Sequence, residues 1–213
     1  QELMGENVFC ESLAGEEIGR MKSWGTHPLS KAEHLMSSPT FMNDLPQTFM
    51  EPLLFKTACK RGSNARMNTE YLRHVQDSDG VMTTCLDRMT GKEITIRSKY
   101  LIGADGGNSL VAEHEDLPIA GKMGVGGSMN ILFKADLSKY VAHRPSVLYW
   151  VMQPGADVGG IGMGLVRMIR PWNEWLIVWG YDINEPAPVV DQKMATDVAR
   201  QLVGDPGLEI ELL

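Results

Sequence analysis

Alternation of apolar and polar residues predicts β-strands in four parts of the chain. Two strand-like stretches flank a turn at Gly15 within residues 7–24. Residues 65–102 predict successive strands, joined by a hairpin turn at the Asp-Gly dipeptide 79–80 and by a later Thr-Gly turn. Further on, LVRMI, RPWNE and WLIVWGY predict a strand, a turn and a strand, and GLEIELL also has a strand pattern.

Helical spacing of apolar residues is found in fewer segments. NDLPQTFMEPLLFKTACKRGSN predicts a helix with Asp44 as a candidate cap, Gly62 at its end and a kink or break at Pro52. NSLVAEHEDL predicts a short helix capped by Asn108 or Ser109.

One amphipathic helix and one loop complete the pattern. DQKMATDVARQLVG predicts an amphipathic helix, capped by Asp191 and ended by Gly204. WGTHPLSKAEHLMSSPT contains two prolines and several serines, which interrupt regular structure, so this segment is predicted to be a loop.

The stretch YLIGADGGNS, residues 100–109, joins a strand signal to a helix signal. YLIGA is continuously apolar, which is typical of a strand buried on both faces. A glycine loop follows and leads into a helix start, an arrangement that presents backbone N–H groups at a sheet edge. The residues alone leave two interpretations open: a plain strand-to-helix turn, or a loop shaped to meet a phosphate or a cofactor.

Composition narrows the class of protein. The 213 residues are 43% hydrophobic and carry a formal net charge of −7, without the basic run that nucleic-acid binding favours. We find no secretory signal and no apolar run near the ~20 residues of a membrane span. Three widely spaced cysteines fit the reduced thiols of a cytoplasmic protein, and neither they nor the histidines show metal-ligand spacing.

Several motifs resemble one enzyme family. YLIGADGGNSLV resembles the Asp-Gly motif of the flavin-dependent aromatic hydroxylases, the single-component FAD monooxygenases. SLAGEEIGR, LPQTFMEPLL and the long stretch from HRPSVLYW to YDINEP are similar to the phenol hydroxylase branch of that family. The family's Gly-x-Gly-x-x-Gly loop and its second Gly-Asp motif are not found, because GVGGSM and GGIGMG lack the strand-then-helix context. We therefore interpret the chain as the middle of such an enzyme.

The resemblance implies a fold and a division into domains. The expected class is α/β, as an α+β mixture, with part of a Rossmann-like FAD-binding domain and an antiparallel-sheet substrate domain. Residues 1–39 are expected to supply substrate-domain strands and a loop. Residues 40–115 then form the C-terminal side of the FAD-binding domain with the Asp-Gly motif, and residues 116–213 form an incomplete substrate domain.

The resemblance also implies cofactor-binding residues. Asp105 and Gly106 match the two residues that name the motif, and Ser109 matches its serine, whereas the usual arginine falls at Ala112. Gln47 matches a glutamine that in relatives reaches the ribityl–phosphate region of the flavin, a task that suits an amide with donors and an acceptor.

Substrate candidates come from the strand pattern near residue 175. In WLIVWGY, Trp175, Ile177, Trp179 and Tyr181 share one face by alternation. Such a face suits a pocket for a chlorinated ring, or it packs as the core of the sheet. Arg167 is predicted to face a phenolate or the flavin, or solvent. Trp175, Trp179 and Arg167 are therefore the substrate candidates, and no residue can be assigned as the catalytic base.

The resemblance implies FAD, NADPH (or NADH) and O₂ as reaction partners. A phenol, in particular a chlorophenol, would be hydroxylated ortho to its hydroxyl group through a flavin C4a-hydroperoxide. Two alternatives stay open: another FAD-dependent oxidoreductase on the same scaffold, and a non-catalytic α+β binding domain. The chlorine pattern of the substrate, the choice between NADPH and NADH, and the existence of a homo-oligomer are left open.

Overall fold

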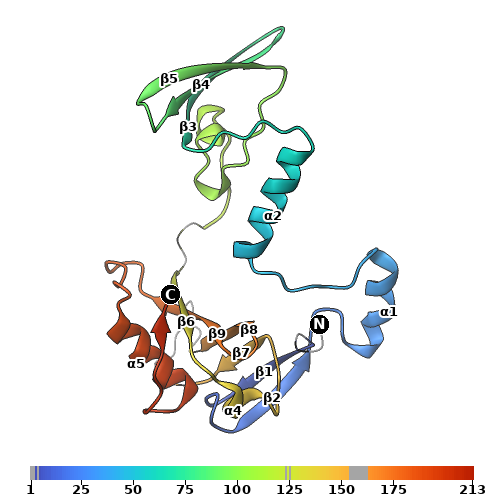
Figure 1. Cartoon of the computed structure of the whole chain (residues 1–213), viewed down its shortest axis with the longest axis vertical. Coiled ribbons are helices and arrows are strands. Elements are labelled where there is room, and N and C mark those ends of the chain that lie inside the picture. Colours follow the sequence, from blue (N-terminus) through green and yellow to red (C-terminus); the bar gives the residue numbers. More distant parts are fainter. Residues whose placement is uncertain (1–2, 4, 123, 125, 154–162) are drawn as a thin grey trace. The chain divides into compact units, whose positions relative to one another are not determined.

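A computed structural model describes residues 3, 5–122, 124, 126–153 and 163–213 (Figure 1). The chain divides into two compact units. Residues 1–47 and 123–213 form the first unit, and residues 48–122 form the second. The mixed helix and strand content agrees with the predicted fold class.

The first unit is built on a seven-stranded sheet in the order β10-β6-β9-β8-β7-β1-β2. Its neighbouring strands are antiparallel except for β1 and β7, which run parallel. The predicted strands around Gly15, the strand–turn–strand after residue 164 and the strand in the last residues are all confirmed. The strands are β1 (Glu6–Cys10), β2 (Glu17–Lys22), β6 (Gly127–Lys134), β7 (Leu148–Val151), β8 (Gly164–Arg170), β9 (Glu174–Tyr181) and β10 (Glu211–Leu212).

One face of this sheet packs against α5 (Gln192–Val203) and forms the core. The predicted caps of α5 are confirmed: the Asp191 carboxylate accepts from the Met194 N–H at 2.7 Å, and Gly204 ends the helix in the left-handed region. The largest fully buried side chains include Trp175, Tyr149, Phe133, Ile131, Ile177, Leu202 and Val166.

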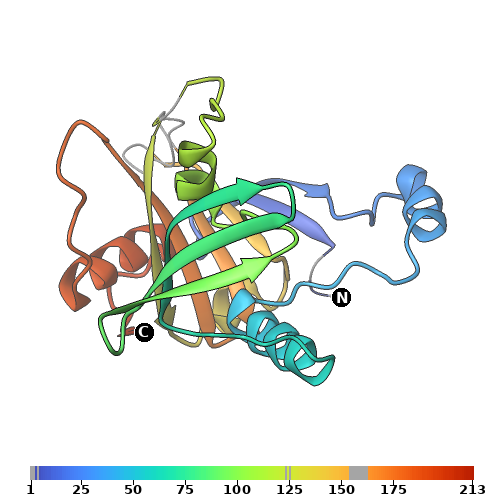
Figure 2. The same cartoon turned by 90° about the horizontal axis from the view of Figure 1, so that it is seen from above.

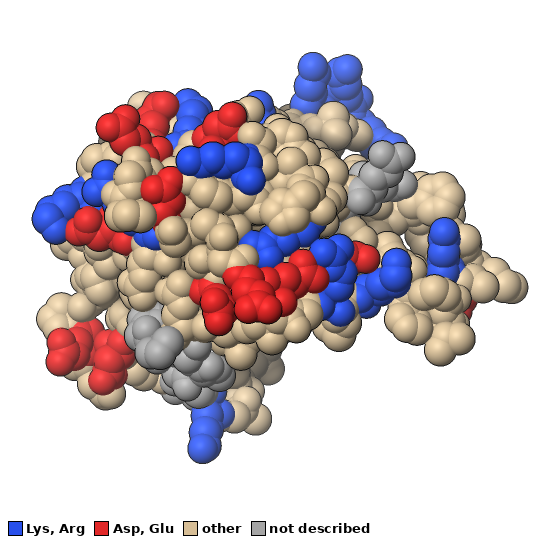
Figure 3. Space-filling view, turned by 90° about the horizontal axis from the view of Figure 1, so that it is seen from below, with Lys and Arg blue, Asp and Glu red and all other residues tan. Residues whose placement is uncertain are grey.

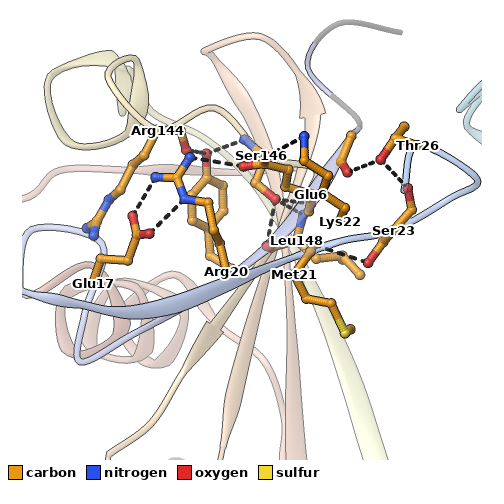
Figure 4. A network of polar contacts seen from close by, with 12 residues as sticks. Glu6, Glu17, Arg20, Met21, Lys22, Ser23, Thr26, Arg144, Ser146 and Leu148 are labelled. Carbon is orange, nitrogen blue, oxygen red and sulfur yellow. Dashed lines mark hydrogen bonds and ion pairs between the residues drawn. The ribbon is translucent and has the colours of Figure 1, made fainter. Parts of the chain in front are cut away.

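A buried arginine, Arg144, forms hydrogen bonds to the turn between β1 and β2. Arg144, which follows the short helix α4 (Ser138–Val141), donates from Nη2 to the carbonyl of Leu13 at 2.7 Å and to that of Gly15 at 3.1 Å. Nearby, Arg20 forms ion pairs with Glu6 at 2.9 Å and with Glu17 at 2.7 Å, as Figure 4 shows. These contacts hold the β1–β2 hairpin in place.

The segment predicted as a loop contains a helix, α1 (Pro28–Ser37), so that prediction is wrong. Pro28 stands at the first helical position, where its missing N–H costs nothing, and Nδ1 of His27 accepts from the Leu29 N–H at 3.2 Å. Pro39 lies beyond the helix end. The residues interpreted as breakers therefore mark the ends of a helix, which buries none of its side chains.

Helix α2 (Gln47–Lys60) confirms the helix predicted from NDLPQTFMEPLLFKTACKRGSN, but it continues without a break through Pro52. A proline removes one backbone donor, here the one that would bond the carbonyl of Thr48 in the first turn. The hydrogen bonds on either side can maintain the helix across that single gap. Asp44 lies three residues before the helix and forms an ion pair with Arg167.

The second unit contains a three-stranded antiparallel sheet of β3 (Thr69–Asp77), β4 (Gly80–Asp87) and β5 (Lys92–Ser98). Both predicted hairpins are confirmed, since Asp77 pairs with Gly80 and Asp87 with Lys92. The 3₁₀ turn η1 (Gly106–Asn108) and helix α3 (Leu110–His114) follow the sheet, and α3 lies beside it (Figure 2).

The apolar stretch YLIGA is not a strand, and the prediction of a strand buried on both faces is wrong here. Tyr100 and Ile102 are 83% and 86% exposed. A strand needs a neighbouring strand to satisfy its backbone groups, and no strand in the described part of the chain pairs with residues 99–104. Apolar character alone therefore did not determine the local structure.

The stretches GVGGSM and GGIGMG, which are interpreted as turns or glycine-containing strands, lie only partly within the described residues. In GVGGSM, Gly127 begins β6. The GGIGMG stretch lies outside the described residues up to residue 162.

On the face drawn in Figure 3, Lys and Arg side chains lie among Asp and Glu side chains. No helix among the described residues is long and apolar enough to cross a membrane.

Candidate functional site

The Asp-Gly loop is organised by a short chain of hydrogen bonds. The Ser109 hydroxyl donates to Asp105 Oδ1 at 2.6 Å, and the same hydroxyl oxygen accepts from the Ala112 N–H at 3.0 Å. Ser109 is thus the N-cap of α3, as predicted. The Ser109 hydroxyl is also the main reason why the pKa of Asp105 is lowered. The result is an exposed carboxylate held at a helix start.

Glycines give this loop its shape. Gly106 has φ +82°, a conformation that side chains disfavour, and a Cβ built on it would have no neighbour within 4 Å. A Cβ on Gly103 would lie 3.0 Å from Cβ of Val111, so glycine there permits the close approach of α3. The backbone at Gly106 is therefore open to a ligand, and Asp105 can accept from its hydroxyl or N–H groups. These features fit a hydroxyl-rich dinucleotide cofactor such as FAD.

Gln47 is the first residue of α2, and its side chain is exposed. It ends the first unit, whereas the Asp105 loop belongs to the second unit. The assignment of Gln47 as a cofactor-binding residue is therefore judged from the residues around Gln47. The segment just before it is fixed by the ion pair between Asp44 and Arg167, which are 2.5 Å apart. Gln47 thus presents an exposed amide at the start of α2, beside an anchored segment.

Arg167 lies on β8 and is already engaged with Asp44. This ion pair offsets its charge, so Arg167 links the sheet to the segment before α2. The sheet register places Arg167 opposite Leu176 of β9 and therefore on the other face from Trp175 and Trp179. The structure does not bring together the three predicted substrate residues.

The two tryptophans of β9 have different environments. Trp175 is fully buried, and its Nε1–H donates to the carbonyls of Trp172 at 2.8 Å and Ala135 at 3.1 Å. Trp179 is half-buried at the edge of the same core. These environments favour the sheet-core interpretation for Trp175, whose indole is enclosed on all sides, and leave Trp179 as the more accessible candidate.

The opposite face of the sheet carries aromatic side chains that the sequence analysis missed. Trp150 lies opposite Leu165, which lies opposite Val178, so the three form a row across β7, β8 and β9. Phe9 stacks near Trp150 with ring centroids 6.3 Å apart and an interplanar angle of 12°. All four are half-buried. Alternation in LYWV could have indicated Trp150, but only the register places it beside Phe9.

Asp105 does not line either of two hollows on the surface of the described residues. One, of about 500 Å³, lies in the second unit between His74, Glu115 and the hairpin turn near Asp79. The other, of about 650 Å³, lies in the first unit beside Trp24 and Phe41. Among the described residues, no three His, Cys, Asp or Glu side chains form a metal site.

Comparisons with known proteins point to one family. A family model described as "FAD binding domain" matches residues 1–213. The chain is 54% identical over 99% of its length to a 2,4-dichlorophenol 6-monooxygenase of Cupriavidus pinatubonensis, covering 35% of that protein. It is 48% identical over its whole length to a phenol 2-monooxygenase of Pseudomonas sp., covering 33% of it.

A solved structure agrees with these relatives. The flavin-dependent monooxygenase PieE, in complex with FAD and substrate, matches with a TM-score of 0.90 and 33% identity. The match covers 99% of this chain and 36% of PieE. The chain thus spans about a third of the length of the proteins it matches.

Proposed function

The chain belongs to the FAD-binding domain family, and from this membership we propose that the full-length enzyme hydroxylates phenols and chlorophenols ortho to the hydroxyl group, using NAD(P)H and O₂ through a flavin C4a-hydroperoxide. The observation that carries the proposal is the 54% identity, over 99% of the chain, to a 2,4-dichlorophenol 6-monooxygenase. Because the chain spans about a third of such proteins, the activity is proposed for the enzyme that contains it.

On the cofactor side, we assign Asp105, Gly106, Ser109 and Gln47. The open backbone at Gly106 permits close approach, and the Asp105 carboxylate, held by Ser109, accepts hydrogen bonds from the cofactor. The Gln47 amide can both donate and accept. When FAD is bound, it supplies the redox chemistry, namely oxidation of NAD(P)H and activation of O₂.

For the substrate, we compare the two faces of the first unit's sheet. The half-buried face, which carries Phe9 and Trp150, is better suited to contact a chlorinated ring than the face that packs as the core. Phe9 and Trp150 offer aromatic surface, and Leu165 and Val178 offer apolar surface beside them. Arg167 lies on the same face and is linked to the segment that ends at Gln47. Trp179, on the other face, stays a candidate that the experiment argued below can exclude.

The chain's residues are proposed to orient the ring and to exclude water from it, which protects the reactive oxygen species from side reactions. A general base would help to form the phenolate, and we assign no residue of this chain to that role.

We propose a cytoplasmic location for the enzyme, because the three cysteines of this chain are free thiols. Its expected partners are a phenol, O₂ and NADPH (or NADH). The division into an FAD-binding part near residues 40–115 and substrate-domain parts at residues 1–39 and 116–213 also remains a proposal. The boundaries of the two units, residues 48 and 122, lie near those limits.

The test is to purify the full-length enzyme and measure three properties: its flavin absorbance spectrum, its consumption of NADPH with and without 2,4-dichlorophenol, and the product by mass spectrometry in ¹⁸O₂. We expect bound flavin, phenol-stimulated NADPH consumption and one labelled oxygen atom in a catechol product.

The other results separate the alternatives. A protein without a flavin spectrum, even after addition of FAD, would support a non-catalytic binding domain. A flavoprotein whose NADPH consumption ignores phenols, and which yields no catechol, would be another FAD-dependent oxidoreductase on this scaffold.

A further inference from the structure

A chain of hydrogen bonds joins strand β3 to the C-terminal end of α3. The Tyr71 hydroxyl lies 2.6 Å from Nδ1 of His74 and 2.8 Å from Nδ1 of His114, the last residue of α3. Nε2 of His74 lies 2.7 Å from Oε1 of Glu115. Tyr71 and His74 of β3 thus contact His114 and Glu115 at the C-terminal end of α3. At the N-terminal end of the same helix, Ser109 binds Asp105.

A β-bulge makes this arrangement possible. Residues three apart on a regular strand point to opposite faces. The pairing of β3 with β4 shifts between Tyr71, which faces Cys85, and Arg73, so Leu72 is an extra residue. The shift places Tyr71 and His74 on one side of the sheet, opposite Cys85 and Thr83 of β4, both of which are buried.

The donors and acceptors of this chain can be arranged in only one direction if both imidazoles are neutral. An ionised Glu115 only accepts, so Nε2 of His74 must carry the proton and Nδ1 is a bare acceptor. The single Tyr71 hydrogen then goes to Nδ1 of His74. The Tyr71 oxygen is left to accept, and Nδ1 of His114 must be the donor.

Tyr71 suits this central place. Burial, and then the nearby carboxylates of Glu115 and Asp105, raise the pKa of its phenol, so it retains its proton as a donor. The imidazole of His74 is also shielded, with 8% of its side chain exposed, whereas Glu115 is 53% exposed. The two inner members of the chain are therefore the ones whose orientation is fixed.

We propose that Tyr71 and His74 are positioning residues for the cofactor loop: the directed chain from His114 through Tyr71 and His74 to Glu115 fixes α3 against β3, and α3 in turn fixes Ser109 and Asp105. This inference rests on the proposed FAD site. It assigns a role to residues that do not themselves touch the cofactor, and it makes flavin affinity depend on one phenol hydroxyl group.

The test uses Tyr71→Phe and His74→Gln in the full-length enzyme. Phenylalanine keeps the ring and removes the hydroxyl. Glutamine keeps a donor toward Glu115, but its carbonyl oxygen does not occupy the position of Nδ1, from which His74 accepts the Tyr71 hydrogen. Hydrogen–deuterium exchange is measured on peptides that cover residues 105–115, and the FAD dissociation constant is measured by flavin fluorescence. The matched control is Arg73→Gln. Arg73 lies on β3 with Tyr71 and His74, and the substitution removes its exposed ion pair to Glu93 of β5.

We expect each variant to raise deuterium uptake in residues 105–115 and to weaken FAD binding about three- to tenfold, which corresponds to the usual net contribution of one hydrogen bond. The double variant should be little worse than Tyr71→Phe alone, because Tyr71→Phe already removes the bond that His74→Gln breaks. Arg73→Gln should change neither readout. If one of the two variants fails to fold, the exchange and FAD binding of the other decide alone.

Two negative results have different meanings. If Asp105→Ala weakens FAD binding while Tyr71→Phe and His74→Gln leave both readouts unchanged, the positioning role is wrong and the cofactor site stands. If Asp105→Ala also leaves FAD binding unchanged, the proposed cofactor site itself is wrong, and the positioning role fails with it.

Discussion

Asp79 and Asp105 both stand before a glycine, and their surroundings differ. Asp79 lies in the hairpin turn between β3 and β4, where its N–H donates to the Asp77 carboxylate at 2.9 Å. Asp105 uses its own carboxylate, which accepts from the Ser109 hydroxyl at the start of a helix. The same dipeptide therefore closes a turn in one place and orders an exposed glycine loop in the other.

This contrast predicts different effects of the same substitution. Asp105→Ala in the full-length enzyme should weaken flavin retention or slow flavin reduction by NADPH, because the carboxylate that organises the loop is lost. Asp79→Ala should cost stability only, by ~1 kcal/mol or less, as is usual for an exposed turn residue. Stopped-flow reduction and flavin content, measured beside thermal unfolding, separate the two effects. Equal and purely structural effects would remove the functional interpretation of Asp105.

At the scale of elements, local signals were sufficient for much of the fold. The hairpin turns after Asp77 and Asp87, the strand–turn–strand of β8 and β9, and the caps of α5 are each determined by neighbouring residues. Ser109 as the N-cap of α3 follows from the same kind of signal. These elements could be predicted because their turn and cap residues lie within a few positions of the hydrogen bonds they make.

Other features depend on distant partners and could not be predicted. Helix α1 is a different case, because it buries no side chain and the prolines at its ends are interpreted as loop residues. The apolar YLIGA segment lacks a pairing strand among the described residues. Alternation places Trp175 and Trp179 on the same face of β9. It does not indicate how deeply each side chain is buried, because burial depends on α5 and on β6. The bulge at Leu72, which brings Tyr71 and His74 together, has no sequence signal at all.

The two faces of the first unit's sheet give a matched pair of variants. Trp150 and Trp179 are both half-buried, on opposite faces. If the Phe9–Trp150 face lines the substrate pocket, Trp150→Leu should raise KM for 2,4-dichlorophenol roughly ten- to hundredfold, from a loss of about 1–3 kcal/mol of stacking and burial. A loosely held ring should also uncouple NADPH oxidation from hydroxylation, so H₂O₂ should accumulate.

Trp179→Leu is the control for the other face. It should lower the thermal unfolding midpoint and leave both KM and the ratio of H₂O₂ formed to NADPH consumed near their original values. The opposite outcome, in which only Trp179→Leu uncouples, would return the pocket to the face that alternation indicated. If neither variant uncouples, both tryptophans are packing residues and the ring is held elsewhere.

At the scale of the whole molecule, the chain contains the Asp-Gly loop, but its 213 residues contain no Gly-x-Gly-x-x-Gly sequence. Such a loop normally holds a pyrophosphate at a helix N-terminus, where backbone N–H groups and the helix dipole act together. The proteins that match the chain are about three times its length, so cofactor binding is expected to be shared with residues that this chain does not supply.

It follows that the purified 213-residue chain should bind FAD weakly. The Asp105 loop and Gln47 can offer a few exposed hydrogen bonds, and each is worth only about 1 kcal/mol net in water. Titration with FAD should leave flavin fluorescence nearly unchanged, while the full-length enzyme should change it. Circular dichroism must first show that the chain is folded, because an unfolded chain would give the same null titration. Binding with a Kd below about 1 μM, or about −8 kcal/mol, would mean that these described residues hold the cofactor by themselves and that the missing glycine loop matters less than proposed.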